Sequence, residues 1–331
     1  MQPKESRPSV LVIAATDSSG GAGLSRDVRV LSDFAVDALC VATAVTAQSD
    51  KRVLAIHYVP PEIIRTQLMA AFETRRVGAV KVGMLGNRAT VEAVAATLAA
   101  TVAAMVAEAG LPGAPAVAAP GGDTPGETDR VSGTEGRPGR LSRLLSHGLA
   151  SHATVPIVVD PVLVSSSGRV LLDSRGRAAL LEKLLPLATL VTPNVPEIAA
   201  LLGEPIAADE VERVNQACRL LEFGCQAILL KGGHATGEEA VDLLVTHGNN
   251  ISSERRQPDG RPSEPGRVAN TVGNLIIERI ASKRVPATSR GTGCALASGI
   301  AATLASGHSL VEACRRAKRY VLETMLTPPG M

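Results

Sequence analysis

The sequence predicts an α/β fold with a central, mostly parallel sheet that is flanked by helices on both faces. Two observations indicate this class. Short apolar runs rich in β-branched residues alternate along the chain with longer helical patterns, which is typical of right-handed βαβ units in a doubly wound sheet. Polar and glycine-rich motifs follow the ends of the short runs, where open α/β sheets bind their ligands.

The short runs have the composition of buried parallel strands. They span residues 10–15, 53–59, 79–82, 155–159, 190–192 and 227–230. The helical patterns that alternate with them span residues 24–34, 61–75, 88–107, 174–184, 195–202 and 209–223. A later run of small apolar residues, 295–306, predicts one more helix.

The order of these elements favours a single domain over residues 1–331, a length that would also accommodate two smaller ones. Two polar stretches interrupt the pattern. Residues 110–140 are rich in Gly and Pro and have almost no bulky apolar side chain, so we expect a disordered insertion there. Residues 247–267 have a similar composition and are expected to form a mobile loop or a lengthened hairpin.

Composition argues against several classes of partner. The chain has three Phe, two Tyr and no Trp, so stacking of bases on aromatic side chains is not expected to be its main activity. The formal net charge of +2 comes without a Lys/Arg tract, and we expect no nucleic-acid partner. No window reaches about 18 uninterrupted apolar residues, which argues against a membrane span. The longest apolar run, 91–106, is interpreted as a buried helix.

The cysteines indicate the compartment. The five cysteines are odd in number and include no C-x-x-C pair, which argues against a disulfide framework and against a structural zinc site. We therefore expect the reducing cytoplasm as the location of the protein.

The turn Gly291-Thr292-Gly293-Cys294 opens the helix predicted at 295–306. Its glycines allow close approach of the backbone to a ligand, and free N–H groups at the start of a helix attract an anion. Cys294 falls in the first turn, where we expect the helix dipole to lower the pKa of the thiol and make it a proton acceptor. The turn is therefore a candidate phosphate cradle with a base beside it.

A second glycine-rich turn, residues 17–23, joins a strand to a helix. Such turns bind phosphates or small polar ligands, but this spacing matches neither the dinucleotide fingerprint nor the P-loop, and a plain connecting turn is the alternative. Asp27, one turn into the helix, faces either a ligand or the solvent. Gln48 offers a donor and an acceptor side by side, which matches an aminopyrimidine edge, although a loop glutamine is the ordinary alternative.

Polar side chains also follow three later strands. Asp160 directly follows the run 155–159, at the position where an acid that binds magnesium is expected. Asn194 and Glu197 lie three apart on one helix face, so they form either an indirect metal clamp or an N-cap with its capping-box partner. Lys231 follows another strand and suits a phosphate, the alternative being a cation in a loop.

Taken in order, these segments resemble the hydroxymethylpyrimidine/phosphomethylpyrimidine kinases of thiamine biosynthesis over about residues 9–325, outside the two polar stretches. The segments that carry the resemblance are Asp17-Ser18-Ser19-Gly20-Gly21-Ala22-Gly23, Ala47-Gln48, Lys81-Val82-Gly83-Met84-Leu85, Val159-Asp160-Pro161-Val162, Thr192-Pro193-Asn194-Val195-Pro196-Glu197, Lys231-Gly232-Gly233-His234 and Gly291-Thr292-Gly293-Cys294. The resemblance implies the ribokinase-like fold, a homodimer, and the use of ATP and Mg²⁺.

The resemblance also implies roles for individual residues. The pyrimidine is bound by the glycine-rich turn, including Gly21, and by Asp27, Gln48 and Met84. Asp160 and Glu197 lie at the magnesium ion, with Asn194 near the ATP phosphates. Residues 291–293 form the anion hole, that is Gly291, Thr292 and Gly293. Cys294 stands where most ribokinase-like enzymes carry an aspartate.

The predicted activity is ATP-dependent phosphorylation of 4-amino-5-hydroxymethyl-2-methylpyrimidine and of its monophosphate. In this prediction Cys294 takes the proton of the alcohol, and Lys231 contacts the phosphates. A pyridoxal kinase-like activity and a non-catalytic sensor of the pyrimidine are the alternatives. The Gln48 amide favours an aminopyrimidine over a pyridine phenol, and a sensor has no need of a metal and phosphate apparatus.

Three positions depart from the pattern of the family. The family commonly has His before the Gly-Thr-Gly-Cys turn, whereas this chain has Ser289-Arg290. Arg29 stands at a place that is often Lys, and Thr46 at one that is usually apolar. A basic residue at 290 could add a phosphate contact.

Overall fold

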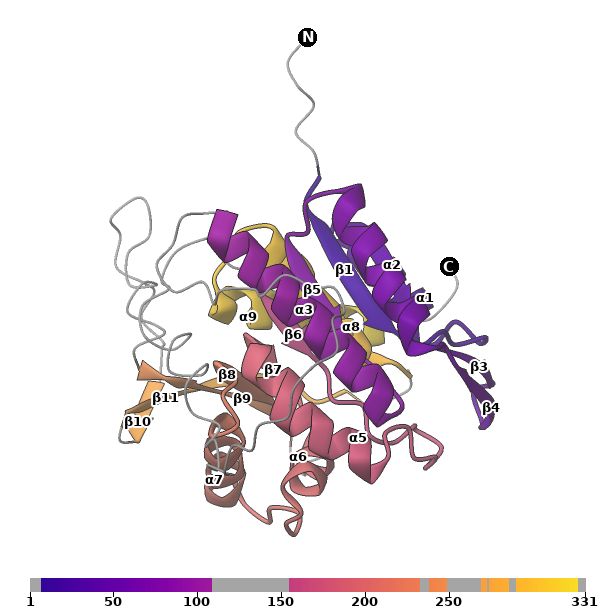
Figure 1. Ribbon diagram of the computed structural model, residues 1–331. Helices are drawn as coiled ribbons and strands as arrows, with labels where there is room; N and C mark the ends of the chain where they lie inside the picture. The colour runs from indigo at the N-terminus through magenta and orange to yellow at the C-terminus, as the bar shows by residue number, and fades with distance from the viewer. Residues whose placement is uncertain are drawn as a thin grey trace, which may run out of the picture.

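The computed structural model describes residues 7–108, 155–232, 238–248, 269–272, 274–285 and 290–326. Within these residues nine strands form one sheet in the order β10-β11-β9-β8-β7-β6-β5-β1-β2 (Figure 1). Their bounds are β1 Ser9–Ala14, β2 Asp37–Ala42, β5 Ala79–Val82, β6 Ile157–Val159, β7 Leu190–Val191, β8 Ala227–Leu230, β9 Glu239–His247, β10 Ala269–Val272 and β11 Leu275–Lys283.

Six neighbouring strands of this sheet, from β2 to β8, run parallel, and β9, β11 and β10 extend it in antiparallel fashion. The prediction of a mostly parallel sheet is therefore confirmed. The chain winds from β1 to β2 on one side and then crosses to β5 on the other side of β1. Ligands of doubly wound folds bind at such a switch point, outside the carboxyl ends of the strands.

Helices cover both faces of the sheet (Figure 1). Alternate residues of β1 point to opposite faces: Leu11 and Ile13 join the core beneath one helical layer, and Val10 and Val12 join the core beneath the other. Residues of α2 Pro61–Thr74, α3 Arg88–Glu108, α5 Ser174–Ala179, α6 Val195–Leu202 and α7 Glu210–Leu221 pack in the first core. Residues of α1 Gly23–Asp33, α8 Thr292–Ala305 and α9 Leu310–Leu326 pack in the second.

Residues 53–59, predicted as a buried parallel strand, form an antiparallel hairpin instead. β4 (Val53–Tyr58) pairs with β3 (Ala44–Gln48) in a separate two-stranded sheet that stands out at one edge of the domain (Figure 1). Most side chains of β4 are exposed. The prediction was wrong because β-branched composition indicates an extended chain but does not identify the strand with which it pairs.

Strands β2 and β3, the carboxyl-terminal part of the sheet and α9 were not predicted. His247 ends strand β9, so the polar stretch predicted at 247–267 begins at a strand end, and residues 249–267 lie outside the described residues. The insertion predicted at 110–140 lies wholly outside them as well. The helix predicted at 174–184 is present as α5 followed by a π turn, Leu180–Leu184, and a short 3₁₀ turn, Leu185–Leu187.

By length and composition α3 is apolar enough to cross a membrane, with a mean hydropathy of 1.3 over Arg88–Met105. A helix in a protein core can have the same length and composition, and one face of α3 is buried in this way. Val91, Val94 and Leu98 are at most 1% exposed and belong to the core beneath the sheet. The interpretation of this run as a buried helix is confirmed for that face.

Candidate active site

Lys231, the residue directly after β8, joins carboxylates that follow two neighbouring strands. Its Nζ donates to Asp160 Oδ1 at 2.9 Å and lies 3.6 Å from Glu197 Oε2. The hydroxyl of the buried Thr192 also donates to Asp160 Oδ1, at 3.2 Å. Because β6, β7 and β8 are parallel, their carboxyl ends meet at one edge of the sheet and bring these side chains together.

Asn194 and Glu197 form a capping box at the start of α6. Asn194 Oδ1 accepts the Glu197 N–H and Glu197 Oε2 accepts the Asn194 N–H, each at 2.7 Å. The capping alternative is thus present in the structure. It does not exclude a ligand role, because the cap engages one polar atom of each side chain and Glu197 still reaches Lys231.

Burial shapes the charges of this cluster. Burial raises the pKa of Glu197, and the positive Lys231 acts against this rise. Burial alone would lower the pKa of Lys231, but the carboxylates of Asp160 and Glu197 raise it above its usual value. Lys231 therefore remains a cation, which is the state that a phosphate contact requires.

The two glycine-rich turns meet backbone to backbone at the start of α8. Gly291 is the N-cap of the helix with φ +74°, and a Cβ there would lie 2.2 Å from Gly21 O, so only glycine fits. A Cβ on Gly293 would lie 3.3 Å from Lys231 Nζ and 3.8 Å from Asp160 Oδ2. The predicted anion hole therefore opens beside the Lys231 cluster.

The helix leaves the N–H groups of Thr292, Gly293 and Cys294 without partners inside α8, as the first turn of any helix does. These groups and the ammonium of Lys231 are hydrogen-bond donors at one place, beside the carboxylates of Asp160 and Glu197. An anion such as a phosphate group is the ligand that such a site attracts.

The expectation of a lowered pKa for Cys294 is wrong. Burial raises the pKa of the thiol to about 11. The ammonium of Lys81 and the backbone N–H of Gly23 favour the thiolate, whereas Asp27 and Asp160 oppose it. Desolvation of the half-buried Cys294 is the largest influence on this pKa, because it penalises the charged thiolate directly.

Asp27 lies in a buried ion pair beneath the cysteine. Its side chain is 0% exposed, with Oδ2 2.8 Å from Lys81 Nζ and Oδ1 accepting from Ser298 Oγ at 2.8 Å. Asp27 therefore does not face the solvent, and its predicted contact with the substrate stays a prediction that requires this buried side chain to become accessible. Burial alone would lower the pKa of Lys81, but Asp27, Cys294 and Asp160 raise it above its usual value.

Helical spacing places this pair next to Cys294. Ser298 follows Cys294 by one turn of α8, and Asp27 follows Gly23 by one turn of α1, so each pair shares a helix face. Lys81 belongs to one of the segments that carry the family resemblance, but the sequence alone indicates no role for it. A single charge within the buried strand β5 was the available signal, because such a charge requires a partner.

The predicted pyrimidine contacts other than Asp27 lie around the first glycine-rich turn. Met84 follows β5 and packs with Ala15, the residue that leads into the turn. Gln48 ends β3, and its Nε2 lies 3.4 Å from Asp17 Oδ2. A Cβ on Gly21 would lie 3.8 Å from the same oxygen. Asp17, almost fully buried, was quoted in a motif but not assigned to the site.

Among the described residues, no group of three or more His, Cys, Asp or Glu side chains is placed to hold a metal ion on its own. Asp160 and Glu197 are nevertheless two carboxylates on one ammonium group, Lys231 Nζ. Magnesium requires only one or two carboxylates when it is bound together with substrate phosphates.

A family model described as phosphomethylpyrimidine kinase matches residues 17–111, 140–261 and 272–330. The hydroxymethylpyrimidine/phosphomethylpyrimidine kinase of Rhizobium meliloti is 34% identical over 311 residues, which cover 94% of this chain and 88% of the relative. The protein of the same name from Escherichia coli is 29% identical over 315 residues, covering 95% and 90%.

Solved structures show the same architecture. The crystal structure of phosphomethylpyrimidine kinase from Clostridium difficile superposes with a TM-score of 0.62 at 25% identity, covering 96% of this chain and all of the other. The pyridoxal kinase of Staphylococcus aureus in complex with AMP-PCP and pyridoxal gives a TM-score of 0.65 at 21% identity, covering 97% and 88%. The second likeness is evidence for the fold alone.

Proposed function

The chain belongs to the phosphomethylpyrimidine kinase family, and on that premise we propose that it transfers the terminal phosphoryl group of ATP to the hydroxymethyl group of 4-amino-5-hydroxymethyl-2-methylpyrimidine and to the resulting monophosphate. The membership confirms the resemblance inferred from the motifs. One observation supports the reaction most strongly: the turn that carries Cys294 also places Gly293 against the Lys231–Asp160 pair. A proton acceptor and a phosphate site are then neighbours.

In the proposed reaction Cys294 is the general base. A primary alcohol is a poor nucleophile, so its proton passes to Cys294 Sγ as the oxygen attacks the terminal phosphorus and ADP leaves. The thiol is protonated in the free enzyme because burial raises its pKa to about 11. The positive Lys81 and the Gly23 N–H favour the small thiolate fraction that accepts the proton.

The charge of the transferred group is neutralised by fixed donors. Phosphoryl transfer depends mainly on positioning and on electrostatic stabilisation, with little covalent chemistry for the protein to perform. Lys231 Nζ lies beside the turn that starts α8, and in this proposal Lys231 and the N–H groups of that turn supply both. The base therefore acts on the attacking alcohol, and the anion site acts on the phosphoryl group that the alcohol attacks.

The donor set suits a magnesium ion that accompanies ATP. Asp160 and Glu197 offer carboxylate oxygens, the ligands that this hard cation prefers, and they would hold it directly or through water. When bound, the ion supplies further neutralisation of the phosphate charge.

Asp160→Asn tests this assignment. The variant removes one carboxylate charge, so we expect ADP release to require an about tenfold higher Mg²⁺ concentration for half-maximal rate, with a lower rate at saturation. The measurement is a Mg²⁺ titration of alcohol-dependent ADP release. Glu222→Gln is the control, because exposed Glu222 is the C-cap of α7 and precedes the start of β8, whereas the site lies at the end of β8. An unchanged Mg²⁺ requirement in Asp160→Asn would contradict the assignment.

The activity itself is tested by ADP release from purified protein with ATP, Mg²⁺ and the pyrimidine alcohol. We expect release that depends on the alcohol, with pyridoxal as a poor competitor because the Gln48 amide matches an aminopyrimidine edge. Pyrimidine binding without alcohol-dependent ADP would favour a sensor. Preferential turnover of pyridoxal would favour a pyridoxal kinase. The names of the curated relatives favour neither alternative.

We also propose that the protein acts as a homodimer in the cytoplasm. Apolar side chains of the β3–β4 hairpin and of the loop beside it are 49–64% exposed, as expected for a surface that a second copy covers. They are Val45, Leu54, Val164 and Val170.

The proposed location in the cytoplasm is supported by the cysteines. All five are free thiols, which suits a reducing compartment.

A further inference from the structure

Arg290, directly before the Gly291 turn, reaches two other segments of the site. Its Nη1 donates to Ser49 O at 3.0 Å and to Asp50 Oδ1 at 3.1 Å, at the tip of the β3–β4 hairpin. The same Nη1 lies 3.4 Å from Ser19 Oγ, and Nη2 lies 3.7 Å from Asp17 Oδ2 in the first glycine-rich turn. One guanidinium group therefore joins the turn to the hairpin.

The two carboxylate oxygens of Asp17 have different hydrogen-bond partners. Its side chain is 3% exposed. Oδ1 accepts the backbone N–H of Ser19 at 2.9 Å and the hydroxyl of the same residue at 2.7 Å. Oδ2 is approached by Gln48 Nε2 at 3.4 Å and by Arg290 Nη2 at 3.7 Å, both longer than a strong charge-assisted hydrogen bond. Two donors thus share the second oxygen, and neither is close.

If the proposed function holds, substrate binding changes which donors lie near Asp17 Oδ2. Gln48 has to turn its amide towards the ring edge of the pyrimidine and so withdraw from Asp17. A nearly buried carboxylate oxygen then loses a donor, which costs free energy unless another donor replaces it. Arg290 is the cation already next to that oxygen.

We propose that Arg290 is a positioning residue that closes on Asp17 Oδ2 when Gln48 turns to the ring. The substrate is then bound without leaving the carboxylate unpaired. The inference rests on the proposed role of Gln48. Ser49 and Asp50 accept hydrogen bonds from Nη1, so a rotation of the planar guanidinium about Nη1 brings Nη2 towards Asp17. The planar guanidinium has enough donors to serve both sides at once, whereas a lysine ammonium is a single point charge.

Steady-state kinetics of Arg290→Ala test the proposal. We expect the KM for the pyrimidine alcohol to rise about tenfold, the effect of one lost charge-assisted interaction, while kcat and the KM for ATP stay within about twofold. In an Asp17→Asn background the same change should raise that KM less than about twofold, because no carboxylate remains to be compensated. Arg290→Lys should fall between the wild type and Arg290→Ala, and it serves as the second variant if the alanine variant does not fold.

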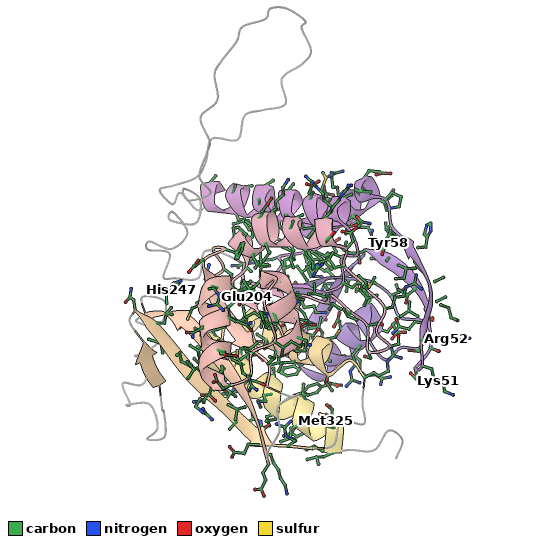
Figure 2. The ribbon with its side chains drawn as sticks, turned by 90° about the horizontal axis from the view of Figure 1, so that it is seen from below. Lys51, Arg52, Tyr58, Glu204, His247 and Met325 are labelled. Atoms are coloured by element: carbon green, nitrogen blue, oxygen red, sulfur yellow. The ribbon has the colours of Figure 1, made fainter. Side chains whose placement is uncertain are left out.

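The matched control is Lys51→Ala, which removes a cation from the same hairpin tip. Lys51 lies at the outer end of the hairpin in Figure 2, and we expect its loss to leave the KM unchanged. An equal KM effect of Arg290→Ala in both backgrounds would overturn the proposal. So would a fall in kcat or a rise in the KM for ATP, either of which would indicate a phosphate contact instead.

Calorimetric titration with the pyrimidine alcohol separates this inference from the proposed reaction. The Kd for the alcohol should follow the same pattern across the four combinations of Asp17 and Arg290 variants, without any turnover. If the pattern appears and ADP release does not, the proposed reaction fails and the role of Arg290 stands. If ADP release appears and the pattern does not, the role of Arg290 fails.

Discussion

Cys294→Ala is expected to lower kcat by about 100-fold or more, the range for loss of a general base. The variant removes the proton acceptor and keeps the N–H groups of Gly291 and Gly293 beside Lys231, so the KM for ATP should change little. ADP release at saturating substrates measures the effect. Cys218→Ala is the control, since Cys218 lies on α7, outside the site. Near-normal turnover in Cys294→Ala would remove the base assignment and leave the anion site intact.

The pH dependence of the wild type tests the same residue without relying on a truncation. A thiol whose pKa is raised to about 11 is protonated at neutral pH, and its thiolate fraction grows about tenfold per pH unit below that value. We therefore expect kcat/KM for the alcohol to rise with pH from about 7 to about 9. Cys294→Asp should keep part of the activity without this rise, because a carboxylate is already ionised there. A flat wild-type profile would contradict the assignment.

Lys81→Met is expected to lower the free energy of unfolding by about 3–5 kcal/mol, because it leaves the enclosed carboxylate of Asp27 without its cation. That loss is a large share of the about 5–15 kcal/mol of a typical domain. Urea unfolding followed by circular dichroism measures it. The exposed Lys183, which pairs with Glu92, provides the matched control Lys183→Met, whose midpoint should hardly move.

The double variant Lys81→Met with Asp27→Leu isolates the cause. Replacing both members of a buried ion pair by apolar side chains is often nearly neutral, so we expect most of the lost stability to return. If the double variant is no more stable than Lys81→Met, an unpaired charge is not the reason for the loss. The double variant should still turn over slowly, because Lys81 favours the Cys294 thiolate more strongly than Asp27 opposes it, and both are gone.

Local pattern was sufficient to predict five of the six parallel strands described, all except β2, and the polar residues that follow three of them. Asp160 and Lys231 each come directly after an apolar β-branched run, and parallel strands place such residues at one edge. The antiparallel strands β9 and β11 were not predicted, because charged residues such as Asp242 and Glu278 interrupt their apolar pattern. Both of these side chains are nevertheless buried.

Contacts between distant segments could not be predicted. Asp27 and Lys81 are 54 residues apart, so helical periodicity gave no sign that the aspartate is enclosed. The prediction of a lowered pKa for Cys294 failed for a related reason. The helix dipole is a local property that the sequence reveals, whereas desolvation depends on what the folded chain packs around the sulfur.

The seating of Gly291 on the carbonyl of Gly21 has a consequence for biogenesis. It couples segments that are 270 residues apart, so the site is incomplete until α8 has left the ribosome and docked on the first βα unit. Contacts of such long sequence separation slow folding and leave the nascent chain exposed in the meantime. A chain interrupted before residue 290 would carry the sheet edge with the acid cluster and be inert.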